Sequence, residues 1–68
     1  MKYKRKDFTI NTIEYANKLF YLIFYKSYCM AVRITEEMAN EAIDNIENDV
    51  YIVERLNKID VLDSMKDL

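Results

Sequence analysis

The chain of 68 residues carries ten Lys or Arg and twelve Asp or Glu, a net charge of −2, with one cysteine and no histidine, glycine or proline. This length allows one small domain, near the size at which a single core barely outweighs chain entropy. A lone cysteine excludes an intrachain disulfide, and the lack of histidine removes the usual ligands of a zinc cluster. Without glycine there is no phosphate-binding glycine loop, and tight hairpin turns are disfavoured, so the composition favours helices.

The charges are divided between the two halves of the chain. Residues 1–33 hold seven basic and two acidic residues, a balance of +5, whereas residues 34–68 hold three basic and ten acidic residues, a balance of −7. Antiparallel halves of opposite sign attract each other within a hairpin or a dimer, although each exposed pair contributes little. The alternative is that the acidic half faces a basic surface of a partner.

Residues 1–7, MKYKRKD, place four basic residues around one tyrosine, and we expect them to form a flexible basic arm. Residues 8–68 are then expected to form a single small helical domain. Phe8 and Ile10 alternate with polar residues, which suits a short extended piece only if a partner strand exists. Basic arms contact phosphates, and the residues that suit such contacts are Lys2, Lys4, Arg5 and Lys6.

Residues 11–32 hold the densest apolar run and most of the aromatic rings, and they are predicted to form a long helix. Asn11 followed by Glu14 fits a capping box at its start. One half of this helix is apolar, and the other half is still rich in rings, which is more apolar surface than one partner helix covers. We therefore expect a homodimer. The residues expected at the interface with a second copy or another partner are Tyr15, Tyr21, Leu22, Tyr25, Tyr28 and Cys29.

A second helix is predicted to begin at Glu36, because Thr35 is a good N-cap and acidic residues in the first turn complement the helix dipole. One continuous helix to Asn57 is the first interpretation, and a break near Asn48 is the alternative. A short third helix with Asp60 as its cap is expected near the C-terminus. The predicted fold class is all-α: a helical hairpin of a long aromatic-rich helix and a long acidic helix, with a short third helix, assembled as a homodimeric helical bundle. The apolar stripe of the second helix contains Met38, Ala39, Ala42, Ile43, Ile46, Val50, Val53 and Leu56.

The residues do not combine into a catalytic or metal site that the sequence supports. A nucleophilic serine or cysteine needs a base, and there is no histidine. Cys29 lies in an apolar run, where a thiol is unreactive and behaves as a small hydrophobic residue. Acidic residues on one side of the second helix have ligand spacing, but carboxylates from one helix seldom complete a metal site. We expect neither an enzyme nor a cofactor.

The leading functional hypothesis is a small protein–protein interaction module, of the kind found as a phage- or plasmid-type inhibitor or regulator, that occupies a surface of a larger, nucleic-acid-handling protein. An acidic helical face can imitate the phosphates of a nucleic acid and block a basic groove. The residues expected to face this larger protein are Glu37, Glu41, Asp44, Glu47 and Tyr51.

Two other classes stay open. Residues 28–34, YCMAVRI, end the first helix or alternate as a strand, and in the second case the order strand, helix, helix resembles a ribbon-helix-helix repressor, which implies DNA binding through the strand. Arg33 is then its only basic residue for reading bases, and the turn lacks the glycine of that family. The second class is peripheral membrane attachment through the basic arm and the aromatic helix. No apolar run reaches the roughly 20 residues of a membrane span, no signal peptide is expected, and the chain is expected to be cytoplasmic.

Overall fold

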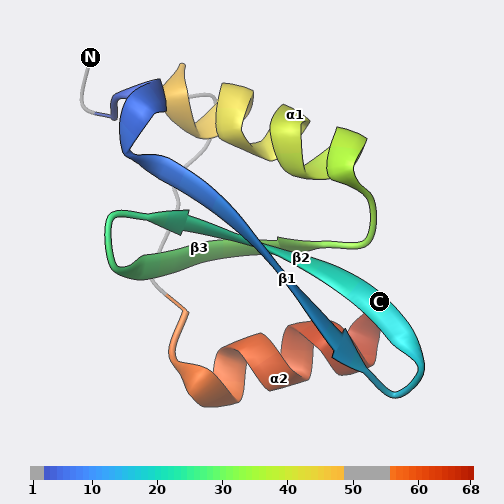
Figure 1. Ribbon diagram of the computed structural model, residues 1–68. Coiled ribbons are helices and arrows are strands. Elements are labelled where there is room, and N and C mark those ends of the chain that lie inside the picture. The colour runs from blue at the N-terminus through green and yellow to red at the C-terminus, as the bar shows by residue number, and fades with distance from the viewer. Residues whose placement is uncertain (1–2, 49–55) are drawn as a thin grey trace.

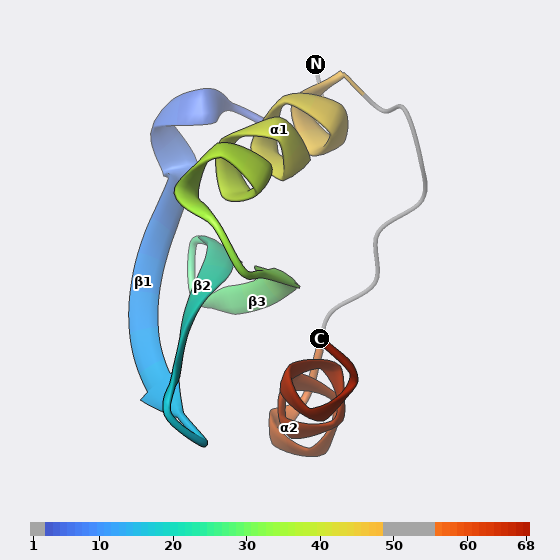
Figure 2. The ribbon, with the colours of Figure 1, turned by 90° about the vertical axis from the view of Figure 1, so that its right-hand side faces the viewer.

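The computed structural model describes residues 3–48 and 56–68 and has an α+β fold, so the all-α prediction is wrong. Three antiparallel strands in the order β1-β2-β3 form one sheet, and a helix packs on each face of it (Figures 1 and 2). The predicted long aromatic helix is absent, because its residues form most of the sheet. The elements are the 3-10 helix η1 (Arg5–Asp7), β1 (Phe8–Tyr15), β2 (Lys18–Tyr25), β3 (Tyr28–Arg33), α1 (Glu36–Glu47) and α2 (Lys58–Asp67).

The central strand β2 explains why the apolar run was mistaken for a helix. Its sequence, KLFYLIFY, is apolar at nearly every position, and Phe20 and Ile23 are both 0% exposed although they point to opposite faces. A strand covered on both faces loses the apolar–polar alternation by which strands are recognised. The run is also rich in aromatic and β-branched residues, which pack well on a pleated surface.

The two hairpin loops turn without glycine. Ala16 and Asn17 have φ of 52° and 64°, the pattern of a type I′ turn, and this two-residue loop joins β1 to β2. Lys26, with φ of 56°, begins the two-residue loop between β2 and β3, whose second residue Ser27 has negative φ, as in a type II′ turn. Non-glycine residues therefore occupy the left-handed region, and the inference from missing glycine to a chain without hairpins was wrong.

The core is divided between the two faces of the sheet. On one face, α1 contributes Ala39, Ala42 and Ile43, which pack against Ile23 and Ala31. On the opposite face, α2 contributes Met65, which belongs to a second cluster. The other buried members of this second cluster are Phe20, Leu22, Cys29 and Val32. Each helix thus covers the face that the other leaves open, and the single chain buries most of the apolar surface for which a dimer was expected.

The predicted first residue and N-cap of α1 are confirmed. The Thr35 side chain accepts a hydrogen bond from the Met38 backbone N–H at 3.1 Å, and the helix begins at Glu36. The helix ends at Glu47, so it does not run on to Asn57. Residues 49–55, which include the predicted stripe members Val50 and Val53, lie outside the described residues.

A helix is present near the C-terminus, but its cap differs from the expected one. Asn57 rather than Asp60 is the N-cap of α2, and the two form a reciprocal capping box. The Asn57 side chain accepts from the Asp60 backbone N–H at 2.8 Å, and the Asp60 carboxylate accepts from the Asn57 N–H at 3.3 Å. Two of the unpaired amides at the start of α2 are thereby satisfied.

Candidate functional site

The two edges of the sheet are built differently, and the edge formed by β3 is interrupted by a bulge and covered near its beginning. The register between β2 and β3 shifts at Ile23/Phe24, so β3 carries a bulge. Beyond the bulge, the Leu56 backbone N–H donates to the carbonyl oxygen of Cys29 at 2.9 Å, and the two residues form an isolated bridge. A bulge and a covering segment are two of the means by which proteins prevent a strand edge from pairing with other chains.

Neither protection is present, among the described residues, at the opposite edge, which β1 forms. All eight residues of β1 pair with β2 without a break, from Phe8↔Tyr25 to Tyr15↔Lys18. In the part of the chain that the structure describes, no segment pairs with the outer side of β1. Figure 2 shows β1 at the outer left of the molecule, with no labelled element beyond it. The strand therefore presents a straight row of backbone donors and acceptors to solvent.

The hairpin geometry fixes which residues of β1 form that row. A two-residue turn closes on a hydrogen-bonded pair, here Tyr15 and Lys18, and pairs of this kind alternate along an antiparallel ladder. At the other end of the strand, the Lys26 N–H donates to the Asp7 carbonyl at 2.9 Å, which agrees with this alternation. Odd-numbered residues of β1 thus bond to β2. The residues whose N–H and C=O groups point to the free edge are Phe8, Ile10, Thr12 and Glu14.

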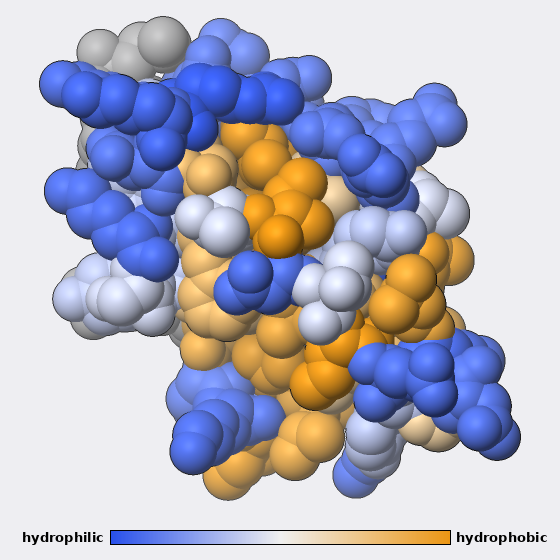
Figure 3. Space-filling model, viewed as in Figure 1, coloured by the Kyte–Doolittle hydropathy of each residue, from blue (hydrophilic) through white to orange (hydrophobic). Residues whose placement is uncertain are grey.

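The side chains along this edge are compatible with a protein contact. Glu14 is the only charged residue of β1, and the strand contains no lysine or proline that would discourage pairing. Ile13 on β1 and Leu19 on β2 are 43% and 49% exposed, which is high for large apolar residues. Figure 3 shows hydrophobic surface across the middle of the face on which β1 lies in front, bordered by hydrophilic surface over α1. This edge with its apolar flanks is the candidate site.

The residues predicted for an interface do not form one surface. Leu22 and Cys29 are buried in the cluster under α2, and Tyr15 packs against the same cluster. Tyr21 is half-buried on the other face, against the cluster under α1. Tyr28 is 42% exposed at the start of β3. The set is therefore distributed over both faces of the sheet.

Tyr25, the remaining member, belongs to an aromatic group at the beginning of β1. Its ring lies edge-on to Tyr3 at 4.9 Å and to Phe8 at 5.0 Å between ring centroids. The Lys26 ammonium lies 5.6 Å from the centre of the same ring. These contacts connect the segment before β1 to the sheet.

The basic residues near the N-terminus are only partly available to a phosphate. The Arg5 guanidinium donates to Asp44 on α1 and lies 3.5 Å from the side-chain oxygen of Asn40. Lys4 and Lys6 are exposed, and Lys2 lies outside the described residues. The Arg5–Asp44 pair joins the basic half of the chain to the acidic half.

The acidic residues of α1 share its outer side, but basic residues flank them. Glu37, Glu41 and Asp44 are exposed on the side opposite the buried stripe. Glu47 is half-buried at the end of the helix, and Tyr51 lies outside the described residues. Contact of this face with a larger, nucleic-acid-handling protein stays a prediction.

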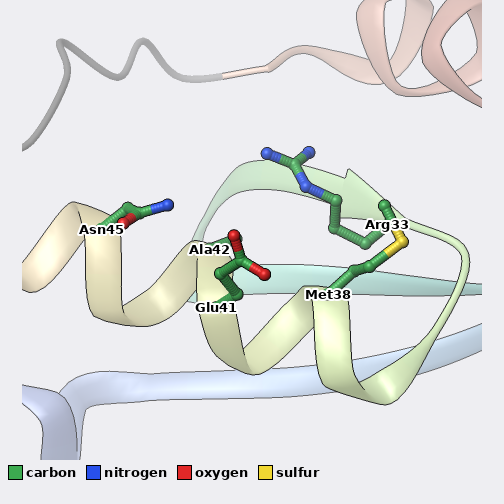
Figure 4. Close-up of a pocket in the computed structure, with 5 residues that line it drawn as sticks. All are labelled: Arg33, Met38, Glu41, Ala42 and Asn45. Atoms are coloured by element: carbon green, nitrogen blue, oxygen red, sulfur yellow. The ribbon is translucent and has the colours of Figure 1, made fainter.

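A small hollow lies beside this acidic side, between the end of β3 and one flank of α1. Figure 4 shows Arg33 reaching over the flank from which Met38, Glu41 and Asn45 project. The volume of the hollow is about 120 Å³, well below the roughly 300 Å³ of the smallest usual small-molecule pockets. The Arg33 guanidinium already donates to the Val32 carbonyl at 2.7 Å. The hollow is too small and too open to define a ligand site.

Cys29 has the environment that the sequence indicated. It is 7% exposed, and burial raises the pKa of its thiol, while a backbone hydrogen bond at Ala31 lowers it by a smaller amount. A buried, protonated thiol is a poor nucleophile. Within residues 3–48 and 56–68, no three potential ligands gather as a metal site would require.

Few features of the sequence indicate the β1 edge. Its functional groups are backbone amides and carbonyls, so no side-chain motif marks them. The alternation of Phe8 and Ile10 with polar residues was the only signal, and it needed a partner strand, which β2 provides. Residues 28–34, the alternative strand of the repressor-like arrangement, do contain β3, but this strand pairs with β2 of the same chain.

Comparison of the chain with protein-family models, with curated protein sequences and with solved structures finds no match. Among the described residues, neither helix has the length and apolar character needed to cross a bilayer.

Proposed function

We propose that this chain is a non-enzymatic protein–protein interaction module that binds by accepting an additional strand at the free edge of β1. In this mode, main-chain hydrogen bonds supply much of the affinity, and the side chains next to the edge supply the specificity. The observation that carries the proposal is the difference between the two edges. Within the described residues, the chain interrupts its β3 edge with a bulge and covers it at Cys29 with Leu56, whereas the eight residues of β1 pair on one side only.

The side chains of and beside β1 also support a binding role for this edge. Edge strands without a binding role commonly carry lysine, proline or a bulge, and β1 carries none of these. The exposed Ile13 and Leu19 offer apolar area next to the backbone groups, so an added strand would be held by burial as well as by hydrogen bonds.

Amide hydrogen exchange tests the proposal, because inward and outward amides alternate along one strand. In the monomeric chain, at concentrations too low for two copies to associate, we expect slow exchange at Thr9, Asn11 and Ile13 and fast exchange at Ile10, Thr12 and Glu14. A protein that binds at the edge should slow the second set and leave the first unchanged. The measurement compares the isolated chain with its complexes captured from a lysate of the source cell. Outward amides that exchange equally fast in every complex would contradict the proposal.

A further inference from the structure

We infer that the strand accepted at the β1 edge is β1 of a second copy, paired antiparallel about a two-fold axis through Asn11. This inference rests on the proposed function and names its partner. The pairing would join two three-stranded sheets into one continuous sheet of both copies, with the two α1 helices on the same face.

Symmetry restricts the register to a few choices. A two-fold axis perpendicular to the sheet keeps each face on its own side, so residues that stand opposite each other must have an even sum of numbers. An even sum also places the outward-directed residues, which all have even numbers, opposite each other, and only these residues exchange hydrogen bonds. With the axis at Asn11, Phe8 pairs with Glu14 of the second copy, and Ile10 pairs with Thr12.

This register is the one that uses every outward-directed residue of the strand. When the axis is moved to Thr12, Phe8 falls opposite Ala16, which lies in the turn at φ of 52° and is no longer in the strand. When it is moved to Ile10, Glu14 falls opposite Lys6, which belongs to η1. Each shift loses hydrogen-bonded pairs at the ends of the two strands.

Charge complementarity also favours an antiparallel second copy. Glu14, the only charge on β1, lies at its C-terminal end, and exposed Lys4 and Lys6 lie just before its N-terminal end. An antiparallel partner brings these opposite charges to the same place twice, once on each side of the axis. A parallel partner would instead place Glu14 beside Glu14 of the other copy, which is unfavourable.

The exposed Ile13 side chain finds an opposite neighbour in the same arrangement. Ile13, which is 43% exposed, stands opposite Thr9 of the second copy. Thr9 of that copy pairs with Phe24 of its own β2, so the three side chains lie in one row across the joined sheet. Leu19, 49% exposed, lies beside Glu14 and so in the row that continues to Phe8 of the second copy. The second copy would therefore contact Ile13 directly, whereas Glu14 would stand between Leu19 and Phe8 of the second copy.

The interrupted β3 edge disfavours growth of such an assembly beyond two copies. A sheet with two free edges adds chains without limit, whereas a sheet with one free edge is complete once that edge is paired. Leu56 occupies the β3 edge at Cys29, and the bulge bends the strand there. The structure thus favours a closed dimer over a fibre.

The first test removes the outward donor of Thr12. Thr12→Pro deletes an N–H that faces the free edge and spares every hydrogen bond to β2, so the folded chain should tolerate it. Both copies lose a donor at the centre of the interface, and we expect the dissociation constant of the dimer to rise roughly tenfold or more. Thr12→Val, which keeps the N–H, is the matched control and should dimerise like the unmodified chain. Sedimentation equilibrium gives the constants, and circular dichroism verifies the fold of each variant.

The second test reads the register and does not depend on proline being tolerated. Asn11→Cys in a Cys29→Ala background places two thiols across the axis at a non-hydrogen-bonded pair, where Cα atoms are about 4.5 Å apart and a disulfide can form. Oxidation should cross-link this variant faster than Thr12→Cys in the same background. Cross-linking that is fastest at Thr12→Cys, or absent from both, would overturn the register.

The outcomes separate this inference from the proposed function. A dimer weakened by Thr12→Pro and cross-linked at Asn11→Cys supports both. A chain that is monomeric at all concentrations, with outward amides that become protected by a different protein, overturns the second copy as partner and leaves the function standing. A dimer of equal strength in Thr12→Pro and Thr12→Val, with unprotected outward amides, overturns both.

Discussion

The Leu56 backbone N–H donates to the Cys29 carbonyl at 2.9 Å, and this single hydrogen bond brings the segment before α2 against the outer side of β3. The contact places Leu56 over the cluster that contains the Cys29 side chain. Among the buried residues of this cluster that the structure describes, Cys29 alone has a titratable side chain, and the protonation of its thiol is linked to folding.

Folding stability should fall at high pH through Cys29. Burial raises the pKa of this thiol in the folded chain, so the folded state keeps a proton that the unfolded state releases. The stabilisation that the protonated Cys29 thiol gives to the folded state is fully present below the ordinary thiol pKa. It is lost as the pH rises through the higher pKa of the folded state. Urea denaturation between pH 7 and 10 measures it, with Cys29→Ala as the reference. A Cys29→Ala chain that loses stability as steeply as the unmodified chain would contradict this linkage.

Ile46 and Ile59 form a matched pair for testing the core. Ile46 is 1% exposed on the buried face of α1, whereas Ile59 is 69% exposed on α2. Ile46→Val should lower the free energy of unfolding by about 0.5–1.5 kcal/mol, because it removes a buried methylene and leaves a small void. Ile59→Val should change it by less than about 0.5 kcal/mol. Chemical denaturation of both variants decides, and equal effects would mean that α1 does not pack as described.

The glycine-free turn between β1 and β2 leaves room for stabilisation. Ala16 has φ of 52°, in the left-handed region of backbone conformation. This region costs free energy for residues other than glycine, and the cost is smallest for Asn and Asp. Ala16→Asn should therefore raise the free energy of unfolding by about 0.5–1 kcal/mol. Ser27→Asn, in the other hairpin loop at negative φ, is the control and should have little effect. A gain at Ser27 equal to that at Ala16 would show that the backbone angle is not the cause.

The capping box at the start of α2 should contribute measurably to stability. Asn57→Ala removes the acceptor for the Asp60 N–H and is expected to cost about 1 kcal/mol. Asn57→Asp keeps an acceptor of equal capping strength, so its free energy of unfolding should stay close to that of the unmodified chain. Asp63→Ala, at an exposed position inside the same helix, controls for the loss of a polar residue. Thermal and urea unfolding measure the free energies of unfolding. An Asn57→Ala variant as stable as the unmodified chain would contradict a stabilising role for this cap.

The ion pair between Arg5 and Asp44 should contribute little. Its side chains are 48% and 63% exposed, so water and salt screen the attraction. A double-mutant cycle with Arg5→Ala and Asp44→Ala is expected to give a coupling of about 0.2–0.5 kcal/mol that nearly disappears in 1 M salt. A coupling above about 1 kcal/mol that persists in salt would indicate a structural role for the N-terminal segment.

The parts of the fold that the sequence predicts correctly are those with local signals. Thr35 caps α1, and the spacing of Ala39, Ala42, Ile43 and Ile46 identifies its buried face. The sheet lacked such signals for two reasons. In β2 both faces are buried, so the period-two pattern is lost, and the turns use Ala16 and Lys26 where glycine is the usual marker. The candidate site was missed because its groups are backbone atoms, and only the register between β1 and β2 reveals which of them are free.

The short loops of the sheet also determine the order in which the chain can fold. The pairings of β1 with β2 and of β2 with β3 lie within residues 8–33 and are closed by two-residue loops, so the two hairpins need only local contacts and should form quickly. During synthesis, the three strands leave the ribosome well before α2 does, because translation proceeds from the N-terminus. Until α2 docks, the apolar face that holds Phe20, Leu22 and Val32 is bare. The nascent chain therefore passes through a stage at which it is most prone to aggregate or to need a chaperone.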